Sequence, residues 1–315
     1  MSNEAELVRE AYHTERPLWR TAADYIELMK PELTSLSVLT ALCSFIVAHT
    51  GVWDGGDFAA LTHLVLGTMF LGGGAGTLNQ YLERRYDRMM KRTENRPLAA
   101  RRLAPEAALL FGIVLASIGL IELAFLVNPL TGCLGIATLL SYIFLYTPMK
   151  RLSPVATTLG GIPGAIPPLM GWAAARNELS YGAFILFAIL FLWQMPHFFS
   201  LGWLYRRDYA RAGFKLLTVV DESGSRTSLH ILANCAALIP ISLMPSVAGM
   251  TSTAYFVGAL VGGMVFLAYA VLFAASFSSA GSVNRSRSSS TARRLFFASL
   301  IYLPSLFFLM VLDKV

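Results

Sequence analysis

Long, uninterrupted apolar segments constrain the fold of this chain more than any other feature of its sequence. Hydrophobic residues make up 55% of the 315 residues and charged residues only 14%, and the mean hydropathy is +0.57. A helix needs about 20 apolar residues to cross the hydrocarbon core of a bilayer, whereas membrane-spanning strands would alternate over about ten residues. We therefore expect an all-α membrane protein, a polytopic bundle of about nine transmembrane helices, at residues 33–51, 58–81, 105–127, 129–147, 155–175, 181–203, 228–249, 253–276 and 294–312.

The basic residues gather on one side of these expected helices. If the loops alternate between the two faces of the membrane, only Arg176 and Lys314 of the 25 Lys and Arg residues fall opposite the amino-terminal arm. The positive-inside rule then places the amino terminus in the cytoplasm and the carboxyl terminus outside. The net charge of +6 follows from this topology and an anionic membrane surface, and it requires no nucleic acid. We divide the chain into a cytoplasmic arm, residues 1–30, whose bases include Lys30, and a single transmembrane domain, residues 31–315.

Several residues that could carry chemistry are better interpreted as structural. Glu122, near the outer end of its expected span, is interpreted as an interfacial carboxylate. The cysteines lie inside expected spans without the spacing of metal ligands, which indicates neither a disulfide framework nor a zinc site. The polar segment 276–294 is expected to be a flexible cytoplasmic loop. The cysteines and histidines interpreted in this way are Cys43, Cys133, Cys235, His49, His63 and His230.

The charge of this apolar chain is concentrated in one stretch, NQYLERRYDRMMKRTENRPL, at residues 79–98. On a helix, Asn79, Glu83 and Asp87 are spaced i, i+4, i+8 and therefore form one column on one face. An amide and two carboxylates suit Mg²⁺, which favours one or two carboxylates together with substrate phosphates. Such a column beside cations is what a departing diphosphate requires, because negative charge develops on it as the carbon–oxygen bond breaks. The bases that follow the column are Arg88, Lys91, Arg92 and Arg96.

A simpler interpretation of this stretch is a charged helix end, held together by i, i+4 ion pairs and retained by the positive-inside rule. Three features favour the chemical interpretation. Asn79 still lies within an apolar run, where a buried polar group is costly. The segment GGGAGT at residues 72–77 precedes it and would let another helix approach closely. The Arg-Pro-Leu at the end of the stretch stops the helix.

The stretch resembles the Asn-xxx-acid-xxx-Asp motif, with its trailing Arg-Thr-xx-Arg-Pro, of the UbiA superfamily of intramembrane aromatic prenyltransferases. A second segment, YTPMKRLSPVATTLGGIPGAIPPLMGW at residues 146–172, begins with Tyr146 and Lys150 at the spacing that the superfamily uses near the diphosphate. The resemblance implies that the column binds magnesium on the diphosphate. It also implies that Tyr146 hydrogen-bonds the diphosphate or faces the allylic cation with its ring. The bases expected to neutralise the diphosphate are Lys91, Arg92, Arg96, Lys150, Arg151 and Arg207.

A third segment, FLWQMPHFFSLGWLYRRDYARAG at residues 191–213, distinguishes between branches of that superfamily. Trp-Gln-x-Pro-His-Phe followed by Asp-Tyr resembles the protoheme farnesyltransferase branch. This likeness implies that His197, Trp193 and Gln194 contact heme and that Asp208 is a further magnesium ligand. A lone membrane histidine could equally be a hydrogen-bonded packing residue. Asp208, with five bases nearby, could equally form an ion pair.

The chain departs from that branch in a few places. Glu83 stands where many members carry aspartate, which keeps the charge and lengthens the arm, and Arg85 stands where many carry another acid. After Gly213, FKLLTVV replaces the usual Ile-Pro-Met-Leu-Pro-Val-Val, so Lys215 and Thr218 occupy proline positions. These changes leave the expected chemistry intact and bear on the shape of the second charged loop.

The branch resemblance implies a magnesium-dependent prenyltransferase. Such an enzyme transfers farnesyl from farnesyl diphosphate to a vinyl group of protoheme IX (heme B), with addition of water, to give heme O. Mg²⁺ is the expected cofactor, and heme B is a substrate. The expected location is the bacterial cytoplasmic (inner) membrane, with the active site toward the cytoplasmic face and heme A synthase or oxidase assembly factors as candidate partners.

Two alternatives stay open at this point. A UbiA-type enzyme could prenylate another aromatic acceptor, such as a hydroxybenzoate or a chlorin, although it would have no reason to carry the WQMPHF segment. A heme-handling membrane carrier is the more distant alternative. Carriers typically place ionisable groups near the bilayer midplane, whereas the acids of this chain cluster at the expected cytoplasmic helix ends.

Overall fold

The computed structural model describes residues 17–277 and 285–315, and for residues 285 and 286 the backbone alone. Within this part of the chain the regular secondary structure is helical, apart from one isolated antiparallel bridge between Thr251 and Lys314. Two segments, η1 and η2, are π-helical. The segments in chain order are α2 (Leu18–Leu28), α3 (Pro31–Ala48), α4 (Gly55–Asp87), α5 (Pro105–Ile121), η1 (Glu122–Val127), α6 (Pro129–Leu140), η2 (Ser141–Tyr146), α7 (Thr147–Leu152), α8 (Ala156–Arg176), α9 (Tyr181–Leu204), α10 (Arg206–Arg211), α11 (Leu217–Val220), α12 (Ser225–Val247), α13 (Thr253–Ala274) and α14 (Arg285–Leu312).

Eight helical stretches of the described chain are long and apolar enough to cross a membrane, which confirms the expected membrane bundle. Two of them include the π-helical segments: α5 continues through η1, and α6 continues through η2 into α7. The expected fifth span, α8, is helical but is not among these eight. Most of its residues are buried, and it packs against α3, α6 and α9, so it is an inner helix of the bundle.

Helix α8 contains three prolines, and neighbouring side chains supply hydrogen-bond donors to its backbone. The prolines remove the donors for the carbonyl oxygens of Leu159, Pro163 and Gly164, and two other carbonyl oxygens of α8 accept bonds from neighbouring helices. Ser44 Oγ donates to the carbonyl oxygen of Pro168 at 2.6 Å, and Gln194 Nε2 donates to that of Gly161 at 2.7 Å. These bonds fix α8 to α3 and α9.

Several helix boundaries differ from the predicted ones, and two of these differences concern the charged segments. Helix α4 continues past the expected end at residue 81 to Asp87, which carries the polar column beyond the apolar run. Helix α14 begins at Arg285 rather than at 294, so the prediction of a loop over 276–294 is wrong for residues 285–294. From Arg287 to Ser290 the exposed polar side chains tolerate a helix because water or headgroups can solvate them beyond the hydrocarbon. Residues 276 and 277 follow α13 outside any helix, and residues 278–284 lie outside the described residues.

The expected close approach at the GGGAGT segment is confirmed. A Cβ on Gly74 would lie 2.6 Å from the backbone nitrogen of Ala116, so α5 packs directly on the α4 backbone at this point. A Cβ on Gly73 would lie 2.8 Å from the Met29 side chain, which belongs to the turn between α2 and α3. The glycines therefore bring α5 and this turn to the part of α4 that precedes the polar column.

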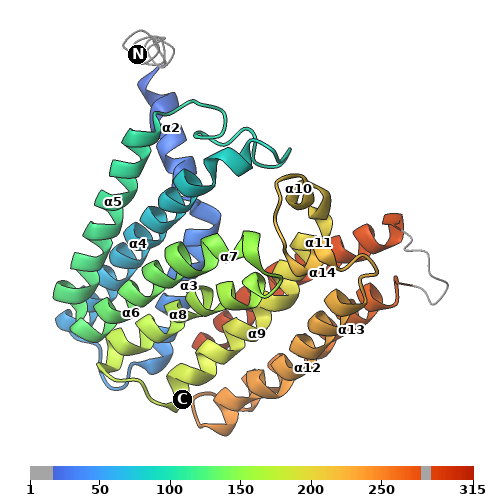
Figure 1. Cartoon of the computed structure of the whole chain (residues 1–315). Helices are drawn as coiled ribbons and strands as arrows, with labels where there is room; N and C mark the ends of the chain where they lie inside the picture. Colours follow the sequence, from blue (N-terminus) through green and yellow to red (C-terminus); the bar gives the residue numbers. More distant parts are fainter. Residues whose placement is uncertain (1–16, 278–284) are drawn as a thin grey trace.

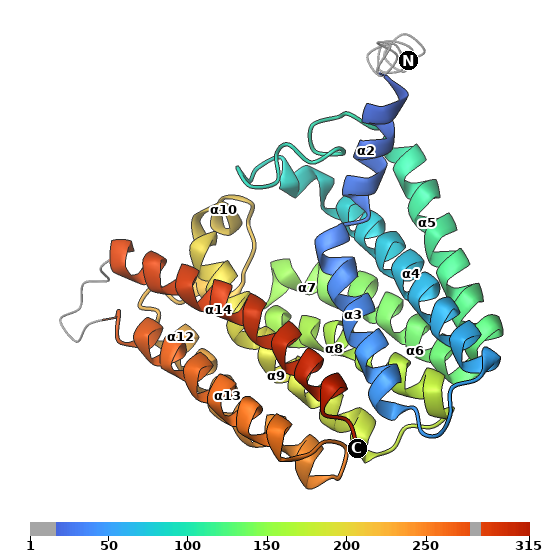
Figure 2. The same ribbon diagram turned by 180° about the vertical axis from the view of Figure 1, so that it is seen from behind.

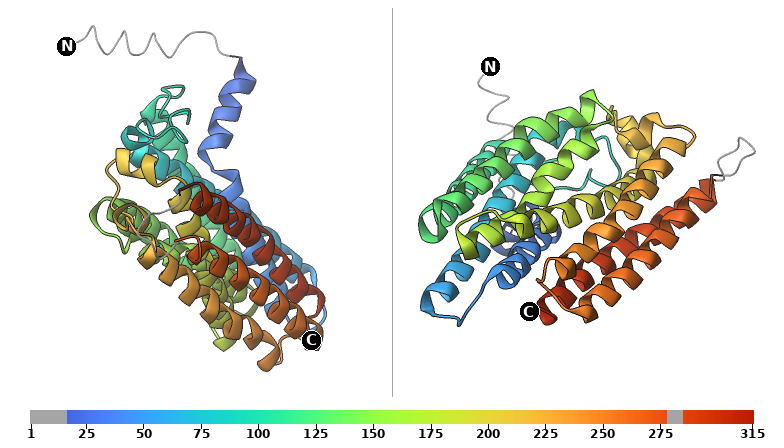
Figure 3. Two further views of the ribbon diagram at one scale, coloured as in Figure 1. Left: turned by 90° about the vertical axis from the view of Figure 1, so that its right-hand side faces the viewer. Right: turned by 90° about the horizontal axis from the view of Figure 1, so that it is seen from below.

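Charged segments gather at one end of the bundle. Figures 1 and 2 place α2, the connection 88–104, α10 and α11 at this end and the carboxyl terminus at the other. Helix α2 projects beyond the long helices there (Figure 3). Arg102 ties it to the bundle through ion pairs with Asp24 at 2.9 Å and Glu27 at 2.5 Å. We call this end of the molecule the charged end.

Candidate active site

The last turns of α4 bring the expected polar column to the charged end. Because α4 is unbroken from Gly55 to Asp87, Asn79, Glu83 and Asp87 lie on one face. The three residues are buried, with exposed fractions of 0%, 7% and 1%. A buried carboxylate or amide is costly unless it is paired, so the partners of these three residues define the site.

Two cations expected from the sequence hold the two carboxylates. Lys150 Nζ, on α7, donates to Glu83 Oε1 at 2.8 Å. Arg96 Nη1, in the 88–104 connection, lies 3.0 Å from each carboxylate oxygen of Asp87. The side chains of Lys150 and Glu83 are only 12% and 9% exposed. Loss of either partner would therefore leave a charge buried without its counterion.

A third cation, Lys30, holds the amide of the column. Its Nζ donates to Asn79 Oδ1 at 2.5 Å. Burial and then the charge of Arg96 lower the pKa of Lys30 to about 7. In the sequence Lys30 counts only as one of the bases of the arm. The signal that could have identified it is its position directly before Pro31 at the start of an apolar run, where a cation needs a partner.

The backbone at Lys30 is held in an uncommon conformation. Its φ of 50° and ψ of 63° lie in the left-handed region, which residues other than glycine rarely adopt. Helix α4 supports this turn, because Gln80 Nε2 donates to the last two carbonyl oxygens of α2 at 3.1 and 3.2 Å. A Cβ on Gly76 would lie 3.1 Å from another carbonyl oxygen of the turn. The residues on either side of Asn79 in α4 thus position the cation that binds it.

Tyr146, at the end of η2, presents its ring to the same cluster. Lys150 Nζ lies 4.4 Å from the centroid of the ring. Asn79 Nδ2 donates to Thr147 Oγ1 at 3.0 Å, which joins the column to the start of α7. The ring also lies against α8, where a Cβ on Gly160 would come within 2.4 Å of its carbons. A π-helical turn therefore places an aromatic face beside a cation, and π-bulges are frequent at functional sites.

The second charged loop contacts the first. Asp208 Oδ1, on α10, pairs with Arg211 at 3.2 Å, and its Oδ2 accepts from the backbone nitrogen of Arg92 at 3.4 Å. Arg92 Nη2 donates to the hydroxyl of Tyr209 at 3.2 Å. The ion-pair interpretation of Asp208 describes these contacts, and a magnesium role for it stays a prediction.

The FKLLTVV segment gives this loop an additional anchor. The backbone nitrogen of Lys215 donates to the carbonyl oxygen of Lys150 at 2.9 Å. Proline, the usual residue of the resembling branch at this position, has no N–H to donate. Thr218 is buried, and its Oγ1 would lie 2.8 Å from a Cβ on Gly202 of α9. The segment therefore fixes the second loop to the residue that pairs with Glu83.

Three other expected diphosphate-binding bases make no ion pair with the column. The guanidinium of Arg151 lies 4.3 Å from the ring centroid of Tyr86, next to Asp87 in the sequence. Lys91 and Arg207 are exposed, and neither takes part in the ion pairs that hold the column. Within residues 17–277 and 285–315, no three His, Cys, Asp or Glu side chains are grouped to hold a metal ion.

His197 lies in an aromatic stack between α9 and α14. Its ring centroid is 5.0 Å from that of Trp193 and 4.8 Å from that of Phe296. Its Nδ1 is hydrogen-bonded to Ser299 Oγ at 2.8 Å, and Trp193 Nε1 donates to the Ser299 carbonyl at 2.9 Å. The packing interpretation of His197 thus describes these contacts. Contact of His197 and Trp193 with heme stays a prediction.

Gln194 connects the WQMPHF segment to the part of α8 that contacts Tyr146. It is 2% exposed and uses its Nε2 to bind the carbonyl oxygen of Gly161. The preceding residue, Gly160, contacts Tyr146. Two consecutive glycines of α8 therefore lie between Gln194 and the aromatic ring beside Lys150. A heme-binding role for Gln194 stays a prediction.

Comparison with known proteins identifies the family of this bundle. The sequence model of the UbiA prenyltransferase family matches residues 37–309, which is most of the chain. The chain belongs to the UbiA prenyltransferase family. Its UbiA domain contains the polar column, Tyr146, Lys150 and His197, whereas Lys30 lies just before the matched region.

Curated relatives of this UbiA-family chain match it nearly end to end. The protoheme IX farnesyltransferase of Solibacter usitatus is 42% identical over 297 residues, covering 92% of this chain and 98% of the relative. The protein of the same name from Myxococcus xanthus is 42% identical over 300 residues, covering 93% and 95%. The mitochondrial protoheme IX farnesyltransferase of Arabidopsis thaliana is 38% identical over 280 residues, covering 89% and 62%.

Solved structures share the UbiA fold at low sequence identity. Digeranylgeranylglyceryl phosphate synthase aligns with a TM-score of 0.74 at 14% identity, covering 93% of this chain and 98% of that one. A UbiA homolog from Archaeoglobus fulgidus bound to GPP and Mg²⁺ aligns with a TM-score of 0.61 at 14% identity, covering 91% and 99%. At such identity the likeness shows the fold, and the chemistry must be argued from the site.

Proposed function

We propose that this protein transfers the farnesyl group of farnesyl diphosphate to a vinyl group of heme B, with addition of water, to give heme O. The relatives named protoheme IX farnesyltransferase carry the proposal, because they are 37–42% identical to the chain over more than nine-tenths of its length. The WQMPHF segment supports the same branch.

The charged end suits a diphosphate leaving group. Lys30, Arg96 and Lys150 converge on one buried column from three separate segments. In this proposal they neutralise the charge that develops on the diphosphate as its bond to the farnesyl carbon breaks. Cations already gathered in a site that excludes water need little reorganisation at that moment, which is the main source of electrostatic catalysis. Arg92, which contacts Asp208 and Tyr209 of the second loop, and Lys91, Arg151 and Arg207 would extend the positive potential toward the entering substrate.

The column also fits magnesium. Asn79, Glu83 and Asp87 offer oxygen donors on one face, with Asp208 as a further candidate from the second loop. Because no three acidic side chains form a closed cage in the described structure, substrate phosphate oxygens would complete the coordination, as is usual for Mg²⁺. Bound magnesium would supply further neutralisation of the diphosphate. The UbiA homolog solved with GPP and Mg²⁺ supports this part of the proposal.

Tyr146 and the WQMPHF segment are assigned to the two organic substrates. The Tyr146 ring already lies beside an ammonium group, and in this proposal it faces the allylic farnesyl cation in the same way. His197, Trp193 and Gln194 would contact the heme acceptor, on the opposite side of the Gly160–Gly161 step in α8. Heme would dock by sharing or displacing the hydrogen bonds that these side chains make within the protein.

The proposed setting is a bacterial inner membrane with the charged end in the cytoplasm. The Lys and Arg excess on that side of the bundle supports this orientation through the positive-inside rule. Heme A synthase and oxidase assembly factors are proposed as partners, because they would consume the heme O that this reaction produces.

The test is mass spectrometry of hemes extracted after membranes with this protein are incubated with heme B, farnesyl diphosphate and Mg²⁺. The expected product is a new heme, heavier by one farnesyl unit plus water, that is absent when Mg²⁺ is removed. Unchanged heme B in membranes that hold folded, inserted protein would contradict the heme assignment, and a screen of other aromatic acceptors would then test the UbiA alternative.

Matched variants test the column itself. Glu83→Ala with Asp87→Ala should abolish turnover while the protein still inserts into the membrane. Glu94→Ala is the control, because Glu94 is an exposed acid of the neighbouring connection and should leave turnover unchanged. Wild-type rates in the double variant would refute the assignment of the column.

A further inference from the structure

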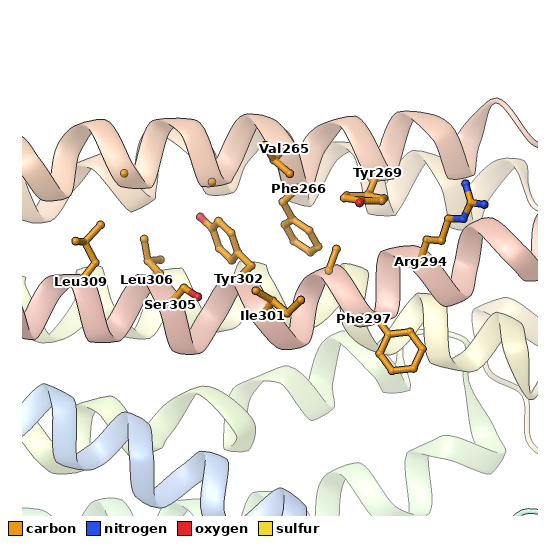
Figure 4. Close-up of a pocket in the computed structure, with 13 residues that line it drawn as sticks. Val265, Phe266, Tyr269, Arg294, Phe297, Ile301, Tyr302, Ser305, Leu306 and Leu309 are labelled. Atoms are coloured by element: carbon orange, nitrogen blue, oxygen red, sulfur yellow. The ribbon is translucent and has the colours of Figure 1, made fainter.

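Helices α13 and α14 leave a long groove between them on the outer surface of the bundle. The groove has a volume of about 560 Å³ and lies between Gly258, Gly262 and Tyr269 of α13 and Arg294, Phe297 and Ile301 of α14. Figure 4 shows the side chains of Tyr269, Arg294, Phe297 and Ile301 along the two helices. We call it the α13–α14 groove. It lies on another side of α14 from Ser299, which faces Trp193 and His197.

The groove has the shape of a channel for a chain-like ligand. On the α13 side Gly262 contributes no side chain, while Phe266 and Tyr302 stack at 5.1 Å within the groove. Its length along α14, from Arg294 to Leu309, corresponds to about 22 Å at 1.5 Å per residue. One leaflet of the hydrocarbon core is about 15 Å thick. An extended acyl chain of one leaflet would therefore fit within the groove.

The charge of the groove is confined to one end. Arg294 is the one charged residue among those that line it, and the other lining residues are apolar, aromatic or small. Figure 4 shows the guanidinium at the end of the row of apolar side chains, beside Tyr269. This end is toward the start of α14, which lies at the charged end of the bundle (Figure 1). An apolar channel that ends at a cation is complementary to an amphiphile with one apolar tail and one anionic head.

We propose that the α13–α14 groove binds an anionic phospholipid, with an acyl chain along the groove and the phosphate on Arg294. The lipid would contact both α13 and α14, which also pack directly against each other. Because α14 also carries Ser299 and Phe296, which contact His197, the bound lipid would hold the helix that supports the WQMPHF segment. The proposal does not depend on which acceptor the enzyme prenylates.

The test is native mass spectrometry of the full-length protein, delipidated in detergent and then mixed with phosphatidylglycerol or with phosphatidylcholine of the same acyl chains. Wild-type protein should retain phosphatidylglycerol about five-fold more than phosphatidylcholine, the factor expected from one basic side chain at an anionic interface. Arg294→Gln should remove this preference, and Arg293→Gln, which changes the neighbouring exposed arginine outside the groove, should keep it. Gly262→Leu should lower retention of both lipids by filling the channel.

Three results would overturn the proposal. Arg294→Gln could keep the wild-type preference, or farnesyl diphosphate alone could displace the retained lipid completely, which would make the groove a substrate site. A dimer that Gly262→Leu dissociates in the absence of lipid would show that a second copy of the chain fills the groove. Because the charge and the channel are changed by separate variants, failure of one variant to fold leaves the other as a test.

Discussion

The pair between Glu83 and Lys150 should behave differently in folding and in catalysis. Its atoms are 2.8 Å apart, and the two side chains are only 9% and 12% exposed. Removing one partner of a buried ion pair typically costs about 3–5 kcal/mol, because the other charge stays buried without a counterion. Lys150→Met should therefore lower the ratio of folded to unfolded protein roughly 100- to 5,000-fold, at about 1.4 kcal/mol per factor of ten.

The double variant separates the two roles of this pair. Glu83→Gln combined with Lys150→Met removes both charges, so the penalty for an unpaired charge disappears. We expect a favourable coupling of about 2–3 kcal/mol relative to the sum of the single variants, at the upper end for residues in contact. Turnover should not return in the double variant. The Glu83 carboxylate and the Lys150 ammonium group are both assigned to the diphosphate site, and the uncharged Gln and Met side chains cannot replace their charges.

The four proteins to compare are the wild type, Glu83→Gln, Lys150→Met and the double variant. Unfolding in mixed detergent micelles, followed by tryptophan fluorescence, measures their stability, and mass spectrometry of the heme product measures their turnover. Glu27→Gln is the control, because Glu27 pairs with Arg102 while its side chain is 47% exposed. It should change stability by less than about 1 kcal/mol. Additive single effects would refute the argument for a mutually dependent buried pair, and an active double variant would show that the pair is purely structural.

Three further outcomes follow from single contacts. Lys30→Met should lower kcat/KM for farnesyl diphosphate at least about tenfold, which is the loss expected for one charge-assisted hydrogen bond. Lys30→Arg should recover part of this loss. Unchanged steady-state kinetics in Lys30→Met would exclude a role for Lys30. Gly160→Ala should destabilise the protein by about 1–3 kcal/mol through its clash with Tyr146, although alanine usually favours a helix, and Gly55→Ala, which meets open space, should not. Hydrogen bonds from Ser252 and Tyr255 hold the pKa of Asp313 below its ordinary value, so this carboxylate stabilises the fold above the pKa of the unfolded chain and loses that effect as pH falls through its folded pKa. The thermal midpoints of wild type and Asp313→Asn should accordingly differ at pH 7 and converge below about pH 4; a constant difference would contradict this reasoning.

Much of the fold and part of the site follow from local rules. The apolar runs predict the membrane helices because the thickness of the bilayer fixes the length of a span. The column of Asn79, Glu83 and Asp87 is predicted because a four-residue spacing lies on one face of any regular helix. The glycines before the column predict a close helix contact because they have no side chains, and Gly74 makes such a contact with α5.

The sequence was less informative where polar segments leave the membrane. The start of α14 was expected at residue 294 and lies at Arg285. Serine and arginine give no periodic apolar signal, so composition alone cannot distinguish a hydrated helix end from a loop. Residue types in the WQMPHF segment indicated a functional role, yet Gln194 and Trp193 use their polar groups to bind α8 and α14.

The sequence by itself determined that this chain is a helical membrane protein with an acidic column at one charged end, because helix periodicity and bilayer thickness act on neighbouring residues. Only the tertiary structure decided which cation pairs with which member of that column. Lys30 is 49 residues from Asn79, and Lys150 is 67 residues from Glu83. Several bases of the chain could have taken these places, and the choice depends on how α3, α4 and α7 pack, which no spacing along one helix encodes.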